Sequence, residues 1–192
     1  MDWTKIVTKT QPAQKRSSFI LSTVSIIVIL LFSSCAAIFI SPLASIKGEE
    51  FGGGVEAGVG SIPLTKNLGL NGVAGYHYYD FENGHDNFMK VGAQIRSQNQ
   101  SSALWYGGEF CVVRDVSVYK DSYWNENPSA SGVSVGAIAG YRLSFEAFDM
   151  SIFSGLSLVN FGDFKADDIV VEPSHSPLQF RVGLEFDLPF SR

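Results

Sequence analysis

Strict alternation of apolar and polar residues near the end of the chain constrains the fold more than any other feature. In LQFRVGLEFDLPF (residues 178–190), the even-numbered residues are all Leu, Phe or Val, whereas the odd-numbered ones are Gln, Arg, Gly, Glu, Asp and Pro. Successive side chains of a β-strand point to opposite faces, so this segment predicts a strand with one apolar and one polar face. The fold depends on which of these faces meets water.

The same alternation recurs after Lys47, punctuated by Gly, Asn, Asp and Ser, with no helical period long enough to interrupt it. It predicts seven strands, at residues 51–62, 68–81, 87–98, 102–119, 132–145, 148–163 and 177–190. Most of them are roughly twice the ordinary strand length of about 5–6 residues. Such strands in a meander match the roughly 9–11 tilted residues that cross a bilayer.

The polar faces of these strands form a mixed-charge set interleaved with glycines. Its members are Glu56, Lys90, Arg96, Glu109, Asp115, Arg142, Arg181, Glu185 and Asp187. Either these residues face water around a soluble barrel with an apolar core, or they pair in a narrow lumen while the apolar faces contact lipid. Glycines on the polar face favour the second arrangement, because they leave room for long Arg and Glu side chains to cross the interior.

Two further features favour a membrane barrel. Aromatic residues of the apolar faces gather near predicted strand ends, where an interfacial girdle forms: Tyr76, Tyr78, Tyr141, Phe145, Phe186 and Phe190. Short connections (TKN, NQSS, EA) also alternate with long ones (KDSYWNENPSAS, GDFKADDIVVEPSHSP). Short periplasmic turns and long extracellular loops give this asymmetry.

The N-terminal part differs from the rest. Residues 1–17 carry four basic residues against Asp2, so the remainder is acidic, and a nucleic-acid partner is not expected. An uncharged run, FILSTVSIIVILLFSSCAAIFI (residues 19–40), follows and predicts a membrane-targeting segment. A signal peptide cleaved near SPLAS, an uncleaved helical anchor, or a lipoprotein box LFSSC with lipidation of Cys35 all fit it.

GVEAGVGSIPLTKNLGLNGVAGYHYY, a strand, short turn and Gly/Tyr-rich return strand, resembles the hairpin unit of the porin-like outer membrane β-barrel domain family of Gram-negative bacteria, the small OmpA/OmpX-like barrels. The terminal VGLEFDLPFSR resembles the aromatic-ending strand that the family's assembly machinery reads. The likeness spans residues 49–192 and carries no catalytic residue. Phe190 is third from the end here, which displaces that signal slightly.

Seven strands conflict with the even count that places both ends of such barrels in the periplasm. The missing strand could be AAIFISPLASI, if the targeting segment ends early, which would fit the parity of the turns. It could also be DIVVEP (residues 168–173), or residues 102–119 could be two strands merged.

Catalytic patterns are weak. His175 lies between Ser174 and Ser176, but adjacent residues in a strand point to opposite faces, and His77 has no partner near it in sequence. ENGHD (residues 82–86) lacks the spacing of an EF-hand or zinc site, FGGGVEAGVG lacks the Lys-Ser/Thr of a P-loop, and Cys111 is interpreted as a small lumen-facing residue. We expect no enzyme activity, cofactor or metal.

The sequence therefore predicts an all-β fold: an antiparallel up-and-down β-barrel of about eight strands (residues 47–192) after an N-terminal hydrophobic signal or anchor helix (residues 1–46). Its expected location is the bacterial outer membrane, with a charge-paired lumen and a structural or surface-interaction role. Expected partners are outer-membrane lipid, the barrel-assembly machinery and a ligand of the extracellular loops. The first alternative is a soluble or lipid-anchored lipocalin-like barrel that carries a hydrophobic ligand against its inward apolar face. The second is an outer-membrane lipid-modifying enzyme.

Overall fold

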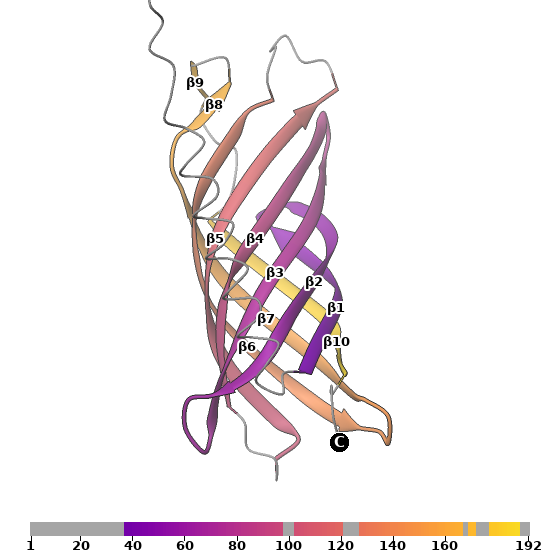
Figure 1. Cartoon of the computed structure of the whole chain (residues 1–192). Coiled ribbons are helices and arrows are strands. Elements are labelled where there is room, and N and C mark those ends of the chain that lie inside the picture. Colours follow the sequence, from indigo (N-terminus) through magenta and orange to yellow (C-terminus); the bar gives the residue numbers. More distant parts are fainter. Residues whose placement is uncertain (1–36, 98–101, 121–126, 167–168, 172–176, 189–192) are drawn as a thin grey trace, which may run out of the picture. The chain divides into compact units, whose positions relative to one another are not determined.

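The computed structural model describes residues 37–97, 102–120, 127–166, 169–171 and 177–188. The described strands are β1 (Ala37–Lys47), β2 (Glu50–Pro63), β3 (Leu68–Phe81), β4 (Gly84–Ser97), β5 (Leu104–Tyr119), β6 (Ser129–Ser144), β7 (Asp149–Phe161), β8 (Phe164–Ala166), β9 (Ile169–Val171) and β10 (Leu178–Leu188). Eight of them form a closed antiparallel barrel in the order β1-β2-β3-β4-β5-β6-β7-β10, because β10 pairs back onto β1 (Figure 1). The prediction of an eight-stranded up-and-down barrel is confirmed.

The two ends of the barrel differ. At the end where β1 begins and β10 ends, called here the terminal end, the strands are joined by residues 64–67, 98–103 and 145–148. At the other end, the loop end, they are joined by residues 48–49, 82–83, 120–128 and 162–177, and the last of these contains β8 and β9 (Figure 1). Because the strand count is even, the start of β1 and the end of β10 lie at the same end of the barrel, as the parity argument required.

Seven strands were assigned from the alternation, and the missing eighth is β1, most of which lies in the AAIFISPLASI segment that fitted the parity of the turns. Its sequence, AIFISPLASIK, alternates like the others, with Phe39, Ser41 and Lys47 buried and Ile40 and Ile46 exposed. Residues 37–46, which the prediction assigned to the targeting segment, are therefore part of the barrel. The expected N-terminal helix and Cys35 fall on residues outside the described part of the chain.

The other two explanations for the missing strand do not hold. Residues 104–119 form the single strand β5. The DIVVEP segment contributes the short β9, which pairs only with β8, and β8 in turn meets β6 at Lys165 opposite Ser129. The β8–β9 hairpin thus extends the sheet beyond the loop end of the barrel without entering its wall.

The barrel wall has one tight turn with a left-handed glycine, one gap in its pairing and one shift of register. β1 and β2 are joined by two residues, of which Gly48 has φ 66°, a left-handed conformation that a glycine adopts without steric cost. The β1–β10 ladder has no partners for Ser41 and Pro42, which suits a proline, because it has no N–H to donate. The β2–β3 ladder shifts register between Val59 and Ile62.

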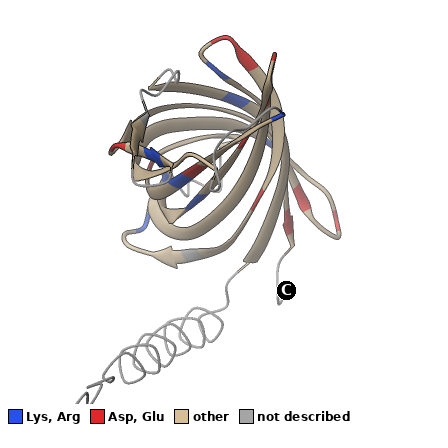
Figure 2. Cartoon of the chain, turned by 90° about the horizontal axis from the view of Figure 1, so that it is seen from above, with Lys and Arg blue, Asp and Glu red and all other residues tan. Residues whose placement is uncertain are grey.

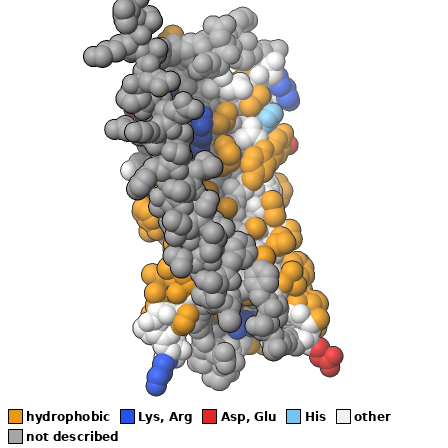
Figure 3. Space-filling model, viewed as in Figure 1, with side chains coloured by type: hydrophobic (Ala, Val, Ile, Leu, Met, Phe, Trp, Pro, Cys, Tyr) orange, Lys and Arg blue, Asp and Glu red, His pale blue; other side chains and the backbone are white. Residues whose placement is uncertain are grey.

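The apolar faces of the barrel strands point outward. On β10, Leu178, Phe180, Val182, Leu184 and Leu188 are 39–49% exposed, while Gln179, Arg181 and Glu185 on the alternate face are 1% exposed. Hydrophobic side chains accordingly cover much of the described surface along the strands (Figure 3). This orientation is the opposite of that in a carrier barrel, whose apolar face lines the interior.

Apolar side chains also fill part of the lumen. One buried cluster consists of Phe39, Val73, Tyr79, Phe88, Cys111, Val113 and Val159, and a second of Leu43, Trp105, Ile138 and Phe153. An eight-stranded interior is just wide enough to be filled by side chains, so these clusters and the charged residues share a packed interior.

Candidate functional site

The polar side chains of the lumen meet at three levels along the barrel. Charged residues lie on strands on several sides of the wall (Figure 2). We call the three groups the central network, the terminal-side network and the Lys47 clamp. Alternate residues of every strand face the lumen, so each strand contributes lumen side chains at several positions along the barrel axis.

Glu109 on β5 is the centre of the central network. Arg181 on β10 donates from Nη1 to Oε1 at 2.7 Å and from Nη2 to Oε2 at 2.5 Å, a two-pronged contact across the lumen. Ser157 on β7 donates to Oε1 at 2.9 Å, and Gln94 on β4 donates to Oε2 at 3.1 Å. Hydrogen bonds to charged groups with this geometry are stronger than neutral ones, which offsets part of the cost of burial.

Glu56 on β2 completes the central network. Lys90 Nζ lies 2.6 Å from Glu56 Oε1 and 3.3 Å from Glu109 Oε2, so this ammonium bridges the two carboxylates. Arg181 Nε lies 3.4 Å and His77 Nε2 3.2 Å from the same Glu56 oxygen. Two carboxylates thus face one ammonium and one guanidinium, and the charges of the four groups balance.

Small residues on the inward face make room for this network. A Cβ added at Gly155 on β7 would lie 2.9 Å from Arg181 Nε, and one added at Gly75 on β3 would lie 3.0 Å from Glu56 Cγ and 3.2 Å from Lys90 Cε. The long side chains therefore run over bare backbone, as expected from the interleaved glycines.

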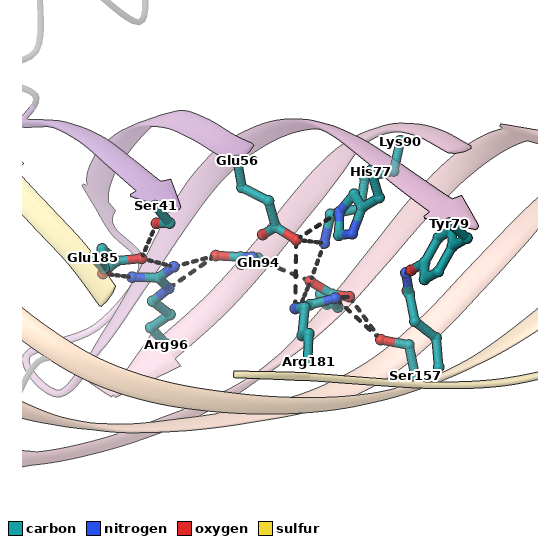
Figure 4. Close-up of polar contacts among 12 residues, drawn as sticks. Ser41, Glu56, His77, Tyr79, Lys90, Gln94, Arg96, Ser157, Arg181 and Glu185 are labelled. Atoms are coloured by element: carbon teal, nitrogen blue, oxygen red, sulfur yellow. Dashed lines mark hydrogen bonds and ion pairs between the residues drawn. The ribbon is translucent and has the colours of Figure 1, made fainter. Parts of the chain in front are cut away.

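The terminal-side network is built on Arg96 and Glu185. The guanidinium donates from Nη1 to Oε1 at 2.5 Å and from Nη2 to Oε2 at 2.7 Å (Figure 4). Gln94 Oε1 accepts from Arg96 Nε at 2.9 Å, which links this network to the central one. The guanidinium also lies over the rings of Phe39, at 4.8 Å, and Trp105, at 4.4 Å, so aromatic faces cover the ion pair.

The Lys47 clamp occupies the loop end of the lumen. Lys47 Nζ donates to Asp86 Oδ2 at 2.6 Å and to Asp115 Oδ2 at 2.7 Å, and all three side chains are fully buried. Glu50 lies 3.6 Å away, and the Tyr79 ring centroid is 5.0 Å from the ammonium. The clamp ties the last residue of β1 to β4 and β5.

The nine charged residues selected from sequence all face the lumen side, but they do not form one network. Glu56, Lys90, Glu109 and Arg181 meet centrally, Arg96 pairs with Glu185, and Asp115 pairs with Lys47. Arg142 and Asp187 instead line a cavity of about 630 Å³ at the terminal end, together with Asp149, Lys66 and Arg96. Arg142 was expected to meet Glu109, Glu185 or Asp187. It shares this cavity with Asp187 and interacts with that carboxylate electrostatically, but no ion pair within 4.0 Å involves Arg142 among the described residues.

Sequence reasoning missed several network members. Lys47 was placed at the domain boundary, and Asp86 in a loop, although its even number puts it on the same face of β4 as Lys90. The uncharged Ser41, Gln94 and Ser157 carried no signal beyond their position on the polar face. Cys111 is buried and free in the lumen, as expected.

The residues considered for catalysis are not brought together as a reactive set. His77 lies against Glu56, His85 stacks on Tyr78, and neither hydrogen-bonds a serine hydroxyl among the described residues; His175 lies outside them. No group of three His, Cys, Asp or Glu side chains in the described part of the chain could hold a metal ion.

No helix among the described residues is long and apolar enough to span a membrane.

Comparisons with known proteins place the barrel among solved structures. The structure is similar to that of Neisserial surface protein A (NspA), with a TM-score of 0.52 and 10% sequence identity over 81% of this chain and 96% of that one. It is also similar to the N-terminal β-barrel domain of Pseudomonas aeruginosa OprF, with a TM-score of 0.53 and 13% identity over 79% and 97% of the two chains. The chain has the fold of small outer-membrane β-barrels.

A third solved barrel, the outer membrane enzyme PagL, has a TM-score of 0.41 and 12% identity over 79% of this chain and 99% of that one, which is too low to support an argument. No protein-family model matches the chain. No curated protein matches it either.

Proposed function

We propose that this protein is a small β-barrel of the bacterial outer membrane, with a lumen closed by paired charges and a structural or surface-interaction role. One observation carries the proposal: a closed barrel exposes its apolar faces and buries its charged ones. Water on the outside would leave a large apolar surface uncompensated, whereas lipid favours this orientation and the closed barrel leaves no unpaired edge.

The dimensions of the outer surface support a membrane location. On β5 the outward residues from Leu104 to Val112 are Leu, Tyr, Gly, Phe and Val, a run of the length that spans the apolar band of a barrel. Exposed aromatic residues lie toward both ends: Tyr76 and Tyr78 toward the loop end, and Tyr106, Tyr141 and Phe145 toward the terminal end. Aromatic belts at both interfaces are typical of such barrels.

The packed lumen supports a structural or surface role over transport. Side chains fill the interior at three charged levels and in two apolar clusters, which leaves no room for a wide solute pore. The longer connections, residues 120–128 and the segment that contains β8 and β9, join strands at the loop end, and we propose that a partner binds there. We place that end outside the cell, since long loops face outward in these barrels.

The remaining partners belong to the same proposal. Outer-membrane lipid would cover the exposed apolar faces, and the assembly machinery would read β10, the closing strand. The role is proposed to be non-enzymatic; an altered lipid profile on expression that disappears when His77 and His175 are substituted would contradict it.

Gel mobility tests the proposal. Washed outer membranes are solubilised in SDS, and the protein is run boiled and unboiled. A faster unboiled band that disappears on heating is expected, because SDS leaves a closed barrel folded. Release of the protein by the wash without any heat-dependent shift would overturn the proposal and favour a soluble barrel.

A further inference from the structure

One cation of the barrel wall breaks the orientation that all the others follow. Lys47, Lys90, Arg96, Arg142 and Arg181 are on the lumen side of their strands. Arg114 on β5 lies on the opposite face, between the buried Val113 and Asp115, and is exposed. It is the one Lys or Arg on the outward faces of the described parts of the eight barrel strands.

Arg114 interrupts the outward apolar face of β5 toward the loop end. Two half-buried valines, Val116 and Val118, continue that face beyond it, but their outward partners on the neighbouring strands are polar: Asn87, His85 and Ser129. Arg114 is the eleventh residue of β5 counted from the terminal end, and the outward residues before it are apolar or glycine. Since roughly 9–11 tilted residues cross the bilayer, this position corresponds to the interface on the loop-end side. On the neighbouring β6, the outward residue opposite Arg114 is Ser131, which likewise follows an apolar run that ends at Val133.

Among the described residues, the surroundings of Arg114 leave its charge without an ion-pair partner. Its partners across the ladders are Met89 on β4 and Ser131 on β6, neither of which is charged. No described carboxylate forms an ion pair with the Arg114 guanidinium, including the exposed Asp163 beyond the end of β7. A second exposed cation, Lys165 on β8, lies opposite Ser129 on the same outer face of β6.

An exposed arginine on the lipid face is costly near the bilayer centre, and the cost falls to little or nothing at the interface. There a guanidinium meets lipid headgroups, and its planar donors match the oxygens of a phosphate in a two-pronged geometry. We propose that Arg114, with Ser131 opposite it on β6, binds the phosphate of an anionic lipid in the outer leaflet. The inference rests on the proposed membrane location with the loop end outside.

Native mass spectrometry of the full chain in detergent micelles tests the inference, with diphosphorylated lipid A as the probe. The R114Q variant is expected to retain about ten-fold less lipid A than the wild type, because one charge-assisted contact is lost. R114K keeps the positive charge but lacks the planar pair of donors, so its retention of lipid A is expected to lie between that of R114Q and that of the wild type. K66Q is the matched control, since it removes an exposed cation from the turn at the terminal end.

Two further ligands test whether the phosphate group of the lipid is what the protein recognises. Lipid A stripped of its phosphates is expected to bind wild type and R114Q equally weakly, and inorganic phosphate is expected not to displace lipid A. Equal retention by R114Q and wild type, tight binding of the stripped lipid, or displacement by inorganic phosphate would each overturn the inference. Should R114Q fail to fold, R114K and S131A provide the same comparison.

The heat-dependent gel shift is measured on every variant. A wild type without the shift would remove the proposed function itself. A wild type that keeps the shift but binds lipid A no better than R114Q would overturn only the inference about Arg114.

Discussion

At the scale of single residues, the lumen is governed by the cost of burying charge. Glu109 accepts hydrogen bonds from Arg181, Ser157, Gln94 and Lys90, so its carboxylate compensates more groups than any other in the central network. An unpaired charge in such an interior is far more expensive than a paired one. Replacing one partner of a buried ion pair should therefore lower the free energy of unfolding more than replacing both partners by apolar residues.

Glu109→Gln tests this asymmetry. The substitution leaves Arg181 and Lys90 facing Glu56 as their one central carboxylate, so the free energy of unfolding should fall by about 3–5 kcal/mol. The double variant E109L/R181M, which replaces the pair by apolar groups of similar size, should recover much of the loss. Urea unfolding in micelles, followed by tryptophan fluorescence, measures both.

Glu146→Gln is the control for charge alone, because Glu146 is exposed in the turn between β6 and β7. It should leave the unfolding free energy unchanged within about 0.5 kcal/mol. A loss for E109Q no larger than that for E146Q would mean that water, not Arg181, compensates the carboxylate.

Gly155→Ala tests the space that the network needs. The new Cβ would lie 2.9 Å from Arg181 Nε, so the Arg181 side chain must shift within the central network, at a cost of about 1–3 kcal/mol in unfolding free energy. The matched control is Gly108→Ala, whose Cβ would lie 3.6 Å from its nearest neighbour, the Gly136 carbonyl oxygen, an ordinary contact. Equal effects of the two variants would show that strand propensity, not the lumen, determines the result.

At the scale of elements, strand alternation could be read from the sequence, and residues 68–81 were predicted with the bounds of β3. Other boundaries moved by up to three residues, as for β4, which begins at Gly84 rather than at residue 87. β1 was hard to assign because its outward Ile residues continue the apolar run before it, and its inward Ser41 and Ser45 carry no charge. Its one charged residue, Lys47, is the last of the strand.

The partners in the lumen could not be predicted in the same way. Odd or even position along a strand predicts which face a residue lies on. Which charged residues meet depends instead on the register and stagger of the strands around the closed barrel. Arg181 and Glu109, 72 residues apart, meet across the lumen, whereas Arg142, on the same polar face by sequence, lies at the terminal end.

Ile40→Lys tests whether β1 faces lipid. Ile40 is 44% exposed on the outer face, so a lysine there should lower the unfolding free energy by up to about 2–4 kcal/mol in a bilayer, with the larger value applying near the midplane. Thr65→Lys, in the exposed turn between β2 and β3, adds the same charge outside the apolar band and should have little effect. Urea unfolding in lipid vesicles compares them. An I40K protein as stable as T65K would exclude a lipid-facing β1.

At the scale of the whole molecule, closure of the lumen is distributed over its length. The Lys47 clamp, the central network and the terminal-side network lie in succession, and the clusters around Phe88 and Trp105 fill space between wall and charges. Opening one level leaves the others in place. Conductance is therefore a property that no single ion pair should control.

Planar bilayer recordings test this redundancy. The wild type should show no steady conductance, with a wide porin in the same lipid as the positive control. R96S/E185S removes both partners of the terminal-side pair, which should enlarge the 630 Å³ cavity at that end but leave the path blocked by Arg181, Glu109 and the Lys47 clamp. Its heat-dependent gel shift must persist for the comparison to apply. Steady current through R96S/E185S alone would mean that one ion pair seals the barrel, and steady current through the wild type would mean that the packed charges form a path for ions, not a plug.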